Sequence, residues 1–193
     1  MKSGRGGSIG RWLPLVAICG LLAGLQCLGE GGREWLRFDR FGLEDGQLWR
    51  LVTGHLVHLG WWHLALNLVG LGLMWALFAA QYSWRQWLLI VAVSMAAIDA
   101  GLYLFSPELQ WYVGLSGVLH GVMAAGVVGY WRRGDPQAWL VTVFLVGKLG
   151  WEQWVGPLAS SEAVAGGAVI VDAHLYGAVG AALGAACFRR LRN

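Results

Sequence analysis

Six long stretches of mostly apolar residues decide what this chain of 193 residues can fold into. About 20 apolar residues in a helix cross the core of a bilayer. The stretches run over residues 12–29, 57–79, 84–105, 112–131, 137–155 and 171–188. With 57% hydrophobic and 13% charged residues, the chain is too apolar for a soluble domain of this size or for a disordered one. The sequence therefore predicts an all-α polytopic membrane protein, with residues 1–193 as one membrane domain.

The distribution of Lys and Arg predicts how these spans are oriented. With the N-terminus in the cytoplasm, nine basic residues lie on the inner side and four on the outer side. The inner residues are Lys2, Arg5, Arg11, Arg85, Arg132, Arg133, Arg189, Arg190 and Arg192, and the outer ones are Arg33, Arg37, Arg40 and Arg50. Both termini are therefore expected in the cytoplasm. The basic residues are dispersed, so nucleic acid is not expected as a partner.

Polar side chains gather where the second, fourth and sixth spans begin, which is the outer face in this topology. His63 and Asn67 lie in the second span, Ser116 and His120 in the fourth, and His174 in the sixth. At about 1.5 Å per residue, Ser116 and His174 lie roughly 5–8 Å below the outer rim. Each residue alone is more simply explained by packing, but polar groups from three helices at one depth predict a functional site.

The chemistry that these residues favour is acyl transfer. A serine hydroxyl is a poor nucleophile until a base takes its proton, and His174 is the candidate base for Ser116. The backbone N–H of Ser116 and the side chains of His63 and Asn67 are candidate donors to an oxyanion. The glycines on either side of the serine, Gly114 and Gly117, permit close backbone approach.

The other charged residues of the spans have less defined roles. Lys148 and Glu152 form an i, i+4 pair, and the cost of about 2.5–3.5 kcal/mol for a lone lysine in lipid predicts that it is paired or in a wet cavity. Two explanations stay open, a mutually neutralising pair and a lysine that holds a substrate carbonyl or C-terminal segment. Asp99 has no evident partner. No acidic third member of the site is evident either, because Asp172 and His174 lie on different sides of a helix, and Asp172 is assigned a loop or cap role.

These motifs resemble those of the rhomboid intramembrane serine proteases, and they occur in the same order along nearly the whole chain. The run 47–53 with His58 and His63-x-x-x-Asn67 is similar to the rhomboid loop and second span, and Ala173-His174-x-x-Gly177 to the last span. Gly114-Leu115-Ser116-Gly117 is similar to the nucleophile motif. The resemblance implies a six-helix bundle whose segment 30–54 lies partly in the outer leaflet. It also implies a Ser116–His174 dyad, an oxyanion hole from His63, Asn67 and the Ser116 N–H, and membrane-anchored protein substrates, with no cofactor and no metal.

One position departs from the common rhomboid pattern. Many rhomboids carry a tyrosine four residues after the nucleophile, packed on the catalytic histidine, whereas this chain has His120. The run 114–121 and Lys148-x-x-x-Glu152 resemble the rhombosortase branch. That branch implies an inner-membrane enzyme, opening to the periplasmic face, which processes exported proteins bearing a C-terminal Gly-Gly motif, an apolar span and a basic tail. His120 lies one turn deeper than Ser116, so it could orient His174 or replace it, and a supporting role is favoured.

The sequence disfavours three alternatives to a serine protease. A catalytically silent rhomboid-like protein that binds membrane clients is disfavoured because such relatives usually lack the serine or the histidine. A small transporter using the charged residues of the third and fifth spans is disfavoured by the lack of repeats and of broken helices. A metalloprotease using His55, His58 and His63 lacks the H-E-x-x-H pattern and a carboxylate ligand or base nearby on the same helix. Hydrolysis and transfer to an amine both stay open as the fate of the acyl-enzyme.

Overall fold

The computed structural model describes residues 7–188, most of which are helical. The helices are α1 Gly7–Gln26, α2 Gly29–Leu36, α3 Arg40–Glu44, α4 Arg50–Thr53, α5 Trp61–Phe78, η1 Ala79–Gln81, α6 Trp84–Phe105, α7 Ser116–Arg133, α8 Gln137–Val155, α9 Ala159–Ala165 and α10 Val171–Ala186. Two short strands, β1 Phe38–Asp39 and β2 Trp111–Tyr112, pair antiparallel. Part of the charge pattern behind the predicted orientation, namely Lys2, Arg5, Arg189, Arg190 and Arg192, lies outside the described residues.

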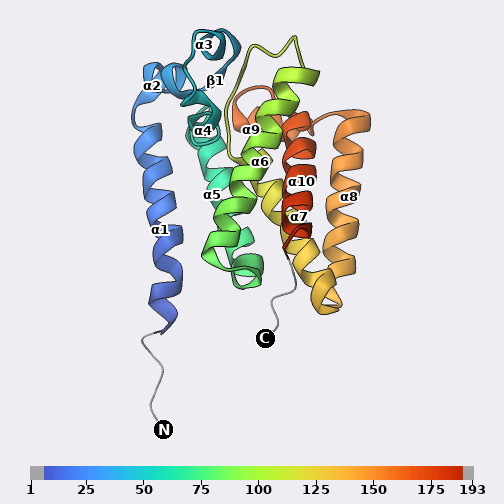
Figure 1. The fold of residues 1–193 in the computed structure, drawn as a ribbon. Coiled ribbons are helices and arrows are strands. Elements are labelled where there is room, and N and C mark those ends of the chain that lie inside the picture. The colour runs from blue at the N-terminus through green and yellow to red at the C-terminus, as the bar shows by residue number, and fades with distance from the viewer. Residues whose placement is uncertain (1–6, 189–193) are drawn as a thin grey trace.

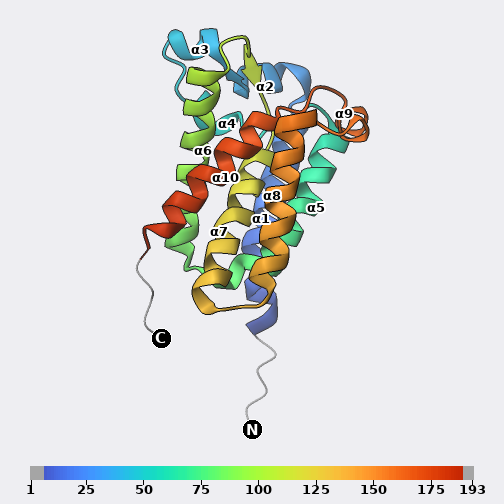
Figure 2. The same ribbon diagram turned by 90° about the vertical axis from the view of Figure 1, so that its right-hand side faces the viewer.

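The long helices lie side by side, and α7 is in the middle of them (Figures 1 and 2). It contacts α5, α6, α8 and α10, with the most extensive contact to α10. Glycine permits this closeness, because a Cβ on Gly117 would lie only 2.8 Å from the backbone oxygen of Ala173 in α10. Helix α7 carries Ser116 and His120, and α10 carries His174, so the close packing of these two helices brings the serine near the histidine.

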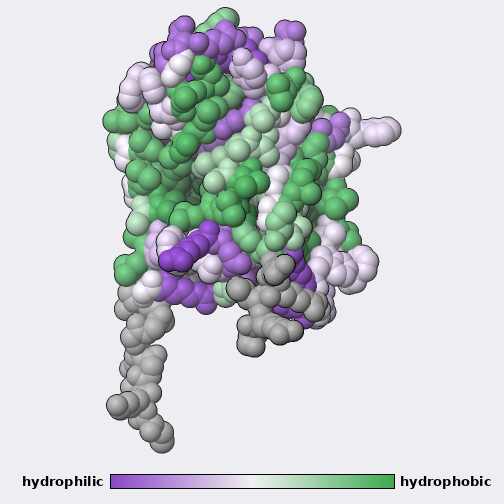
Figure 3. Space-filling model, in the orientation of Figure 1, coloured by the Kyte–Doolittle hydropathy of each residue, from purple (hydrophilic) through white to green (hydrophobic). Residues whose placement is uncertain are grey.

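The surface and the helix lengths fit a multi-pass membrane protein. Figure 3 shows a broad apolar region between hydrophilic residues at the two ends of the molecule. By length and hydropathy, Trp61–Gln81 and Trp84–Phe105 can each cross a membrane. Gly10–Gln26 with Gly29–Leu36, bent by 109°, would make a third span.

The remaining long helices, α7, α8 and α10, occupy the predicted fourth, fifth and sixth spans. Within residues 7–188, none of these three is both long and apolar enough to be assigned as a membrane span from length and hydropathy alone. Helix α10 is 16 residues long, and α7 is an interior helix that carries serine, histidine and many glycines. An interior helix touches protein rather than lipid, so it tolerates such residues. The count of six spans stays a prediction.

The segment between α1 and α5 folds over one end of the bundle as α2, β1, α3 and α4 (Figure 1). Arg50 is buried and holds this segment together, donating from Nη1 to the carbonyl oxygens of Glu34 and Arg37, each at 2.9 Å. Arg40 donates to the carbonyl oxygens of Leu102 and Tyr103 near the end of α6, both at 3.0 Å. The amphipathic segment is therefore attached to the same end of the bundle where α5, α7 and α10 begin.

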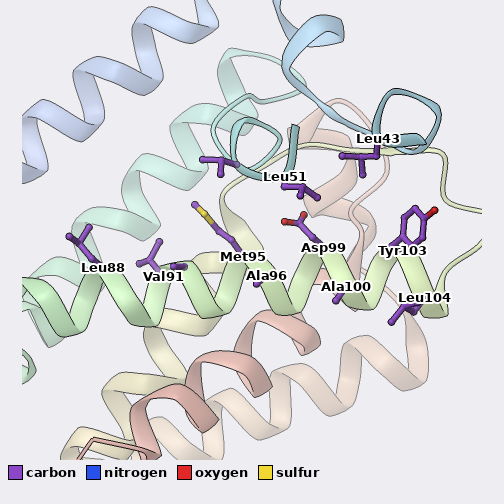
Figure 4. A pocket seen from close by; sticks show the side chains of 12 residues that line it. Leu43, Leu51, Leu88, Val91, Met95, Ala96, Asp99, Ala100, Tyr103 and Leu104 are labelled. Atoms are coloured by element: carbon purple, nitrogen blue, oxygen red, sulfur yellow. The ribbon is translucent and has the colours of Figure 1, made fainter. Parts of the chain in front are cut away.

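A groove of about 680 Å³ lies between this segment and α6, and Asp99 points into it (Figure 4). The walls are mostly apolar and include Leu43, Leu51, Val91 and Met95. Asp99 Oδ1 lies 3.1 Å from Nε2 of His55, and the two side chains are only 9% and 1% exposed. The structure therefore gives Asp99 the partner that sequence spacing did not reveal.

Candidate active site

Ser116 and His174 come together at the end of the bundle covered by the α2–α4 segment. Ser116 is the first residue of α7, and His174 lies in the first turn of α10. The Nε2 atom of His174 lies 2.9 Å from Oγ of Ser116, which is hydrogen-bond distance. His174 is buried, whereas Ser116 is half-buried. The candidate nucleophile and the candidate base, 58 residues apart in sequence, are thus in contact.

The loop before Ser116 is held in an unusual conformation that only glycine adopts easily. Gly114 has φ +122°, a region that L side chains rarely adopt. Its N–H donates to the carbonyl of Gly54 at 3.0 Å. Its own carbonyl accepts from the Tyr112 hydroxyl at 2.7 Å. These hydrogen bonds fix the backbone conformation just before α7 and therefore the position of Ser116.

His63 and Asn67 are both buried in α5, and His63 lies beside this loop. The N–H of Leu59 donates to Nδ1 of His63 at 3.3 Å, so in the neutral ring Nε2 carries the proton and is a donor. That Nε2 lies 3.1 Å from where a Cβ on Gly114 would be, which places the imidazole directly against the serine loop. Asn67 Nδ2 donates to the carbonyl of His63 at 2.9 Å. The His63 imidazole is thus held beside the loop that enters α7, whose first backbone N–H groups have no partner within the helix.

His120 lies against the face of the His174 ring, one helical turn along α7 from Ser116. The two imidazoles are stacked, with centroids 4.1 Å apart and planes at 17°. Nδ1 of His120 is 2.7 Å from the carbonyl oxygen of Ser116. A carbonyl can only accept, so Nδ1 carries the proton and is directed at the backbone, not at the serine hydroxyl. Nδ1 of His120 is thus engaged by the backbone, and the ring lies against that of His174.

A carboxylate lies next to His174, and this is where the sequence-based expectation was wrong. Glu152 in α8 places Oε2 3.0 Å from Nδ1 of His174, and its Oε1 pairs with Lys148. No acidic third member had been evident, because nothing in the spacing shows that α8 turns this residue toward α10. The available signal was a carboxylate within an apolar span. Asp172, by contrast, has its Oδ2 3.4 Å from the Ser106 hydroxyl.

One group of ligand-type side chains among residues 7–188 is compact enough to hold a metal ion. It consists of His120, Glu152 and His174, whose ligand atoms lie within 4.8 Å of one another. The same atoms already have protein partners, and the Lys148 ammonium beside Glu152 opposes a cation there. The His55, His58 and His63 set is not such a group, since His55 is paired with Asp99.

Comparison with known proteins agrees with the motifs. Residues 45–190 match the Rhomboid domain family, and this range contains every candidate site residue. A Bacillus subtilis (strain 168) protein named "Putative rhomboid protease YdcA" is 31% identical over 90 residues. That match covers 47% of this chain and 45% of the relative, so the chain matches less than half of the relative's length.

Proposed function

Because the chain belongs to the rhomboid family, we propose that it is an intramembrane serine endopeptidase with Ser116 as nucleophile and His174 as general base. The observation that carries this proposal is the 2.9 Å approach of His174 Nε2 to Ser116 Oγ. A serine protease needs this contact, and a client-binding relative does not. Both side chains are present and in reach of one another, which disfavours the silent alternative.

The proposed reaction begins with attack of Ser116 Oγ on the carbonyl carbon of a peptide bond. As the new C–O bond forms, the hydroxyl proton passes to Nε2 of His174, and the carbonyl oxygen becomes an oxyanion. The C–N bond then breaks, and His174 gives its proton to the leaving amine. Water, or an acceptor amine, attacks the resulting ester with His174 again as base, which releases the new C-terminus and regenerates Ser116.

The oxyanion would be stabilised by donors that are already oriented before substrate binds. The Ser116 N–H lies at the start of α7, where the helix dipole favours negative charge. His63 Nε2–H lies against the serine loop, and Asn67, one turn further along α5, is proposed as a second side-chain donor. Oriented donors of this kind are each worth about 2.7–4 kcal/mol of barrier in a serine protease.

The substrate class is proposed from the branch that the motifs resemble. The run 114–121 and the Lys148–Glu152 pair are similar to rhombosortases, so exported proteins with a Gly-Gly motif, an apolar span and a basic tail are the proposed substrates. We place the enzyme in the inner membrane with both termini in the cytoplasm and the site toward the outer face. The attachment of the amphipathic α2–α4 segment at the site end supports this orientation.

Co-expression with an exported reporter that ends in such a C-terminal signal tests the proposal. We expect cleavage by the wild-type chain, no cleavage by Ser116→Ala, and wild-type cleavage by Ser160→Ala, which removes an exposed serine of α9. Mass spectrometry of the new C-terminus shows whether water or an amine resolves the ester. A reporter that stays uncut in all three strains would contradict the substrate class, and one cut equally in all three would contradict the role of Ser116.

A further inference from the structure

We propose that Glu152, held in place by Lys148, is the positioning residue that orients His174 for proton transfer, an inference that rests on the proposed function. The site would then be a relay of Ser116, His174 and Glu152, with the last member supplied by α8. Nothing in the sequence pattern or the family match assigns this role.

The two oxygens of Glu152 have different partners. Oε2 lies 3.0 Å from Nδ1 of His174, and Oε1 pairs with the Lys148 ammonium. An ionised carboxylate only accepts hydrogen bonds, so Nδ1 of His174 must be the donor. The lone pair of the neutral ring is then on Nε2, which faces Ser116 Oγ at 2.9 Å. Glu152 thus selects the tautomer that can take a proton from the serine.

Burial explains why the carboxylate needs Lys148. The side chains of Glu152 and His174 are only 8% and 4% exposed, and an unpaired charge so buried is costly. Lys148 lies one turn earlier on α8 with its side chain 34% exposed, so its ammonium reaches Oε1 from the helix edge. The pair keeps Glu152 ionised, and the carboxylate then stabilises the imidazolium that forms when His174 accepts the proton.

One further contact of the imidazole and the packing of the preceding residue limit the movement of His174. His120 stacks on its face at 4.1 Å, and Ala173, the residue before it, is fully buried beside Gly117. With Glu152 on Nδ1 and the serine on Nε2, both ring nitrogens have a partner. Such a ring needs no reorganisation before it acts as a base.

The alternative is that Glu152 and Lys148 only join α8 to α10, and the amide variant Glu152→Gln separates the two explanations. Lys148 can only donate, so in this variant it holds the amide oxygen and turns the NH2 group toward His174. That NH2 forces Nδ1 to accept and places the ring proton on Nε2, which can no longer accept from Ser116. Adding Lys148→Met frees the amide to turn its oxygen toward Nδ1, which restores the productive tautomer.

The test measures the rate at which a fluorophosphonate probe labels Ser116 in the purified full chain, so no natural substrate is needed. In this reaction the Oγ–P bond forms, fluoride leaves, and His174 takes the hydroxyl proton. We expect Glu152→Gln to label at least about 100-fold more slowly than wild type. The Glu152→Gln/Lys148→Met variant should label at least about tenfold faster than Glu152→Gln alone, with Lys148→Met alone as its reference.

The outcomes separate this inference from the proposed function. Faster labelling on adding Lys148→Met to Glu152→Gln supports the positioning role of Glu152. If Lys148 and Glu152 were only a structural pair, replacing Lys148 as well would weaken the protein further. Labelling of Glu152→Gln at the wild-type rate, or no gain in the double variant, overturns the positioning role while the serine protease assignment stands. Absence of Ser116-dependent labelling in the wild-type chain would instead contradict the proposed function. Elution as a single monodisperse species checks that each variant is folded.

Discussion

The imidazole of His120 lies flat on that of His174, with ring centroids 4.1 Å apart and the planes inclined by only 17°. His120 follows Ser116 by one turn of α7, so the helix that carries Ser116 also places a ring against His174 on α10. The stack is a contact of ring faces, and the polar edge of His120 is turned to the backbone carbonyl of Ser116. The contact therefore depends on the flat shape of the His120 ring.

Substitution of the two histidines should have unequal effects. We expect His174→Ala to abolish Ser116-dependent cleavage, because no other base contacts Oγ within residues 7–188. His120→Ala should lower the rate by about 2- to 10-fold, the equivalent of one aromatic contact. His120→Phe should recover much of that loss, since it keeps a flat ring. Rates of reporter cleavage measure this ranking, and a more severe defect in His120→Ala than in His174→Ala would reverse the two roles.

Removal of the proposed oxyanion donors should slow the chemical step without unfolding the protein. Asn67→Ala and His63→Ala are each expected to lower the cleavage rate by about 10²- to 10³-fold. Gln153→Ala, at an exposed position of α8, is the matched control and should leave it unchanged. Single-turnover cleavage in detergent is the measurement. Near wild-type rates in both α5 variants would show that the oxyanion is stabilised elsewhere.

Gly114→Ala should damage the site through the backbone. The residue has φ +122°, and a Cβ there would lie 2.9 Å from Cε1 of His63, so both the loop and the imidazole must shift. Strain of this kind costs about 1–3 kcal/mol. We expect a lower melting temperature and loss of activity, whereas Gly147→Ala, where a Cβ meets nothing within 4 Å, should be tolerated. Equal behaviour of the two variants would remove the argument for a constrained serine loop.

The buried His55–Asp99 contact should stabilise the attachment of the α2–α4 segment to α6. Asp99→Leu leaves His55 buried without this partner, which is expected to cost about 1–3 kcal/mol of unfolding free energy. The double variant His55→Leu/Asp99→Leu should lose less than the sum of the single variants, because neither polar group is then stranded. Denaturant titration in detergent measures the coupling. Strict additivity would mean that the two side chains do not act as a pair.

Much of the site could be predicted from the sequence because its signals are local. His63 and Asn67 are four residues apart on one helix face, and the glycines around Ser116 mark a close backbone approach. The partner of Asp99 and the carboxylate partner of His174 could not be predicted in this way. His55 is 44 residues from Asp99, and Glu152 is 22 residues from His174, each on a different element. Spacing along one helix carries no information about such pairs.

The sequence by itself determined the apolar stretches, the polar residues at their beginnings and the family to which the chain belongs. These follow from hydropathy and from motifs, which are properties of short segments. Only the tertiary structure decided that α8 turns Glu152 toward His174, that His120 stacks on the same ring, and that Lys148 takes the other carboxylate oxygen. The physical reason is that the rotation of one packed helix against another depends on the side chains of both.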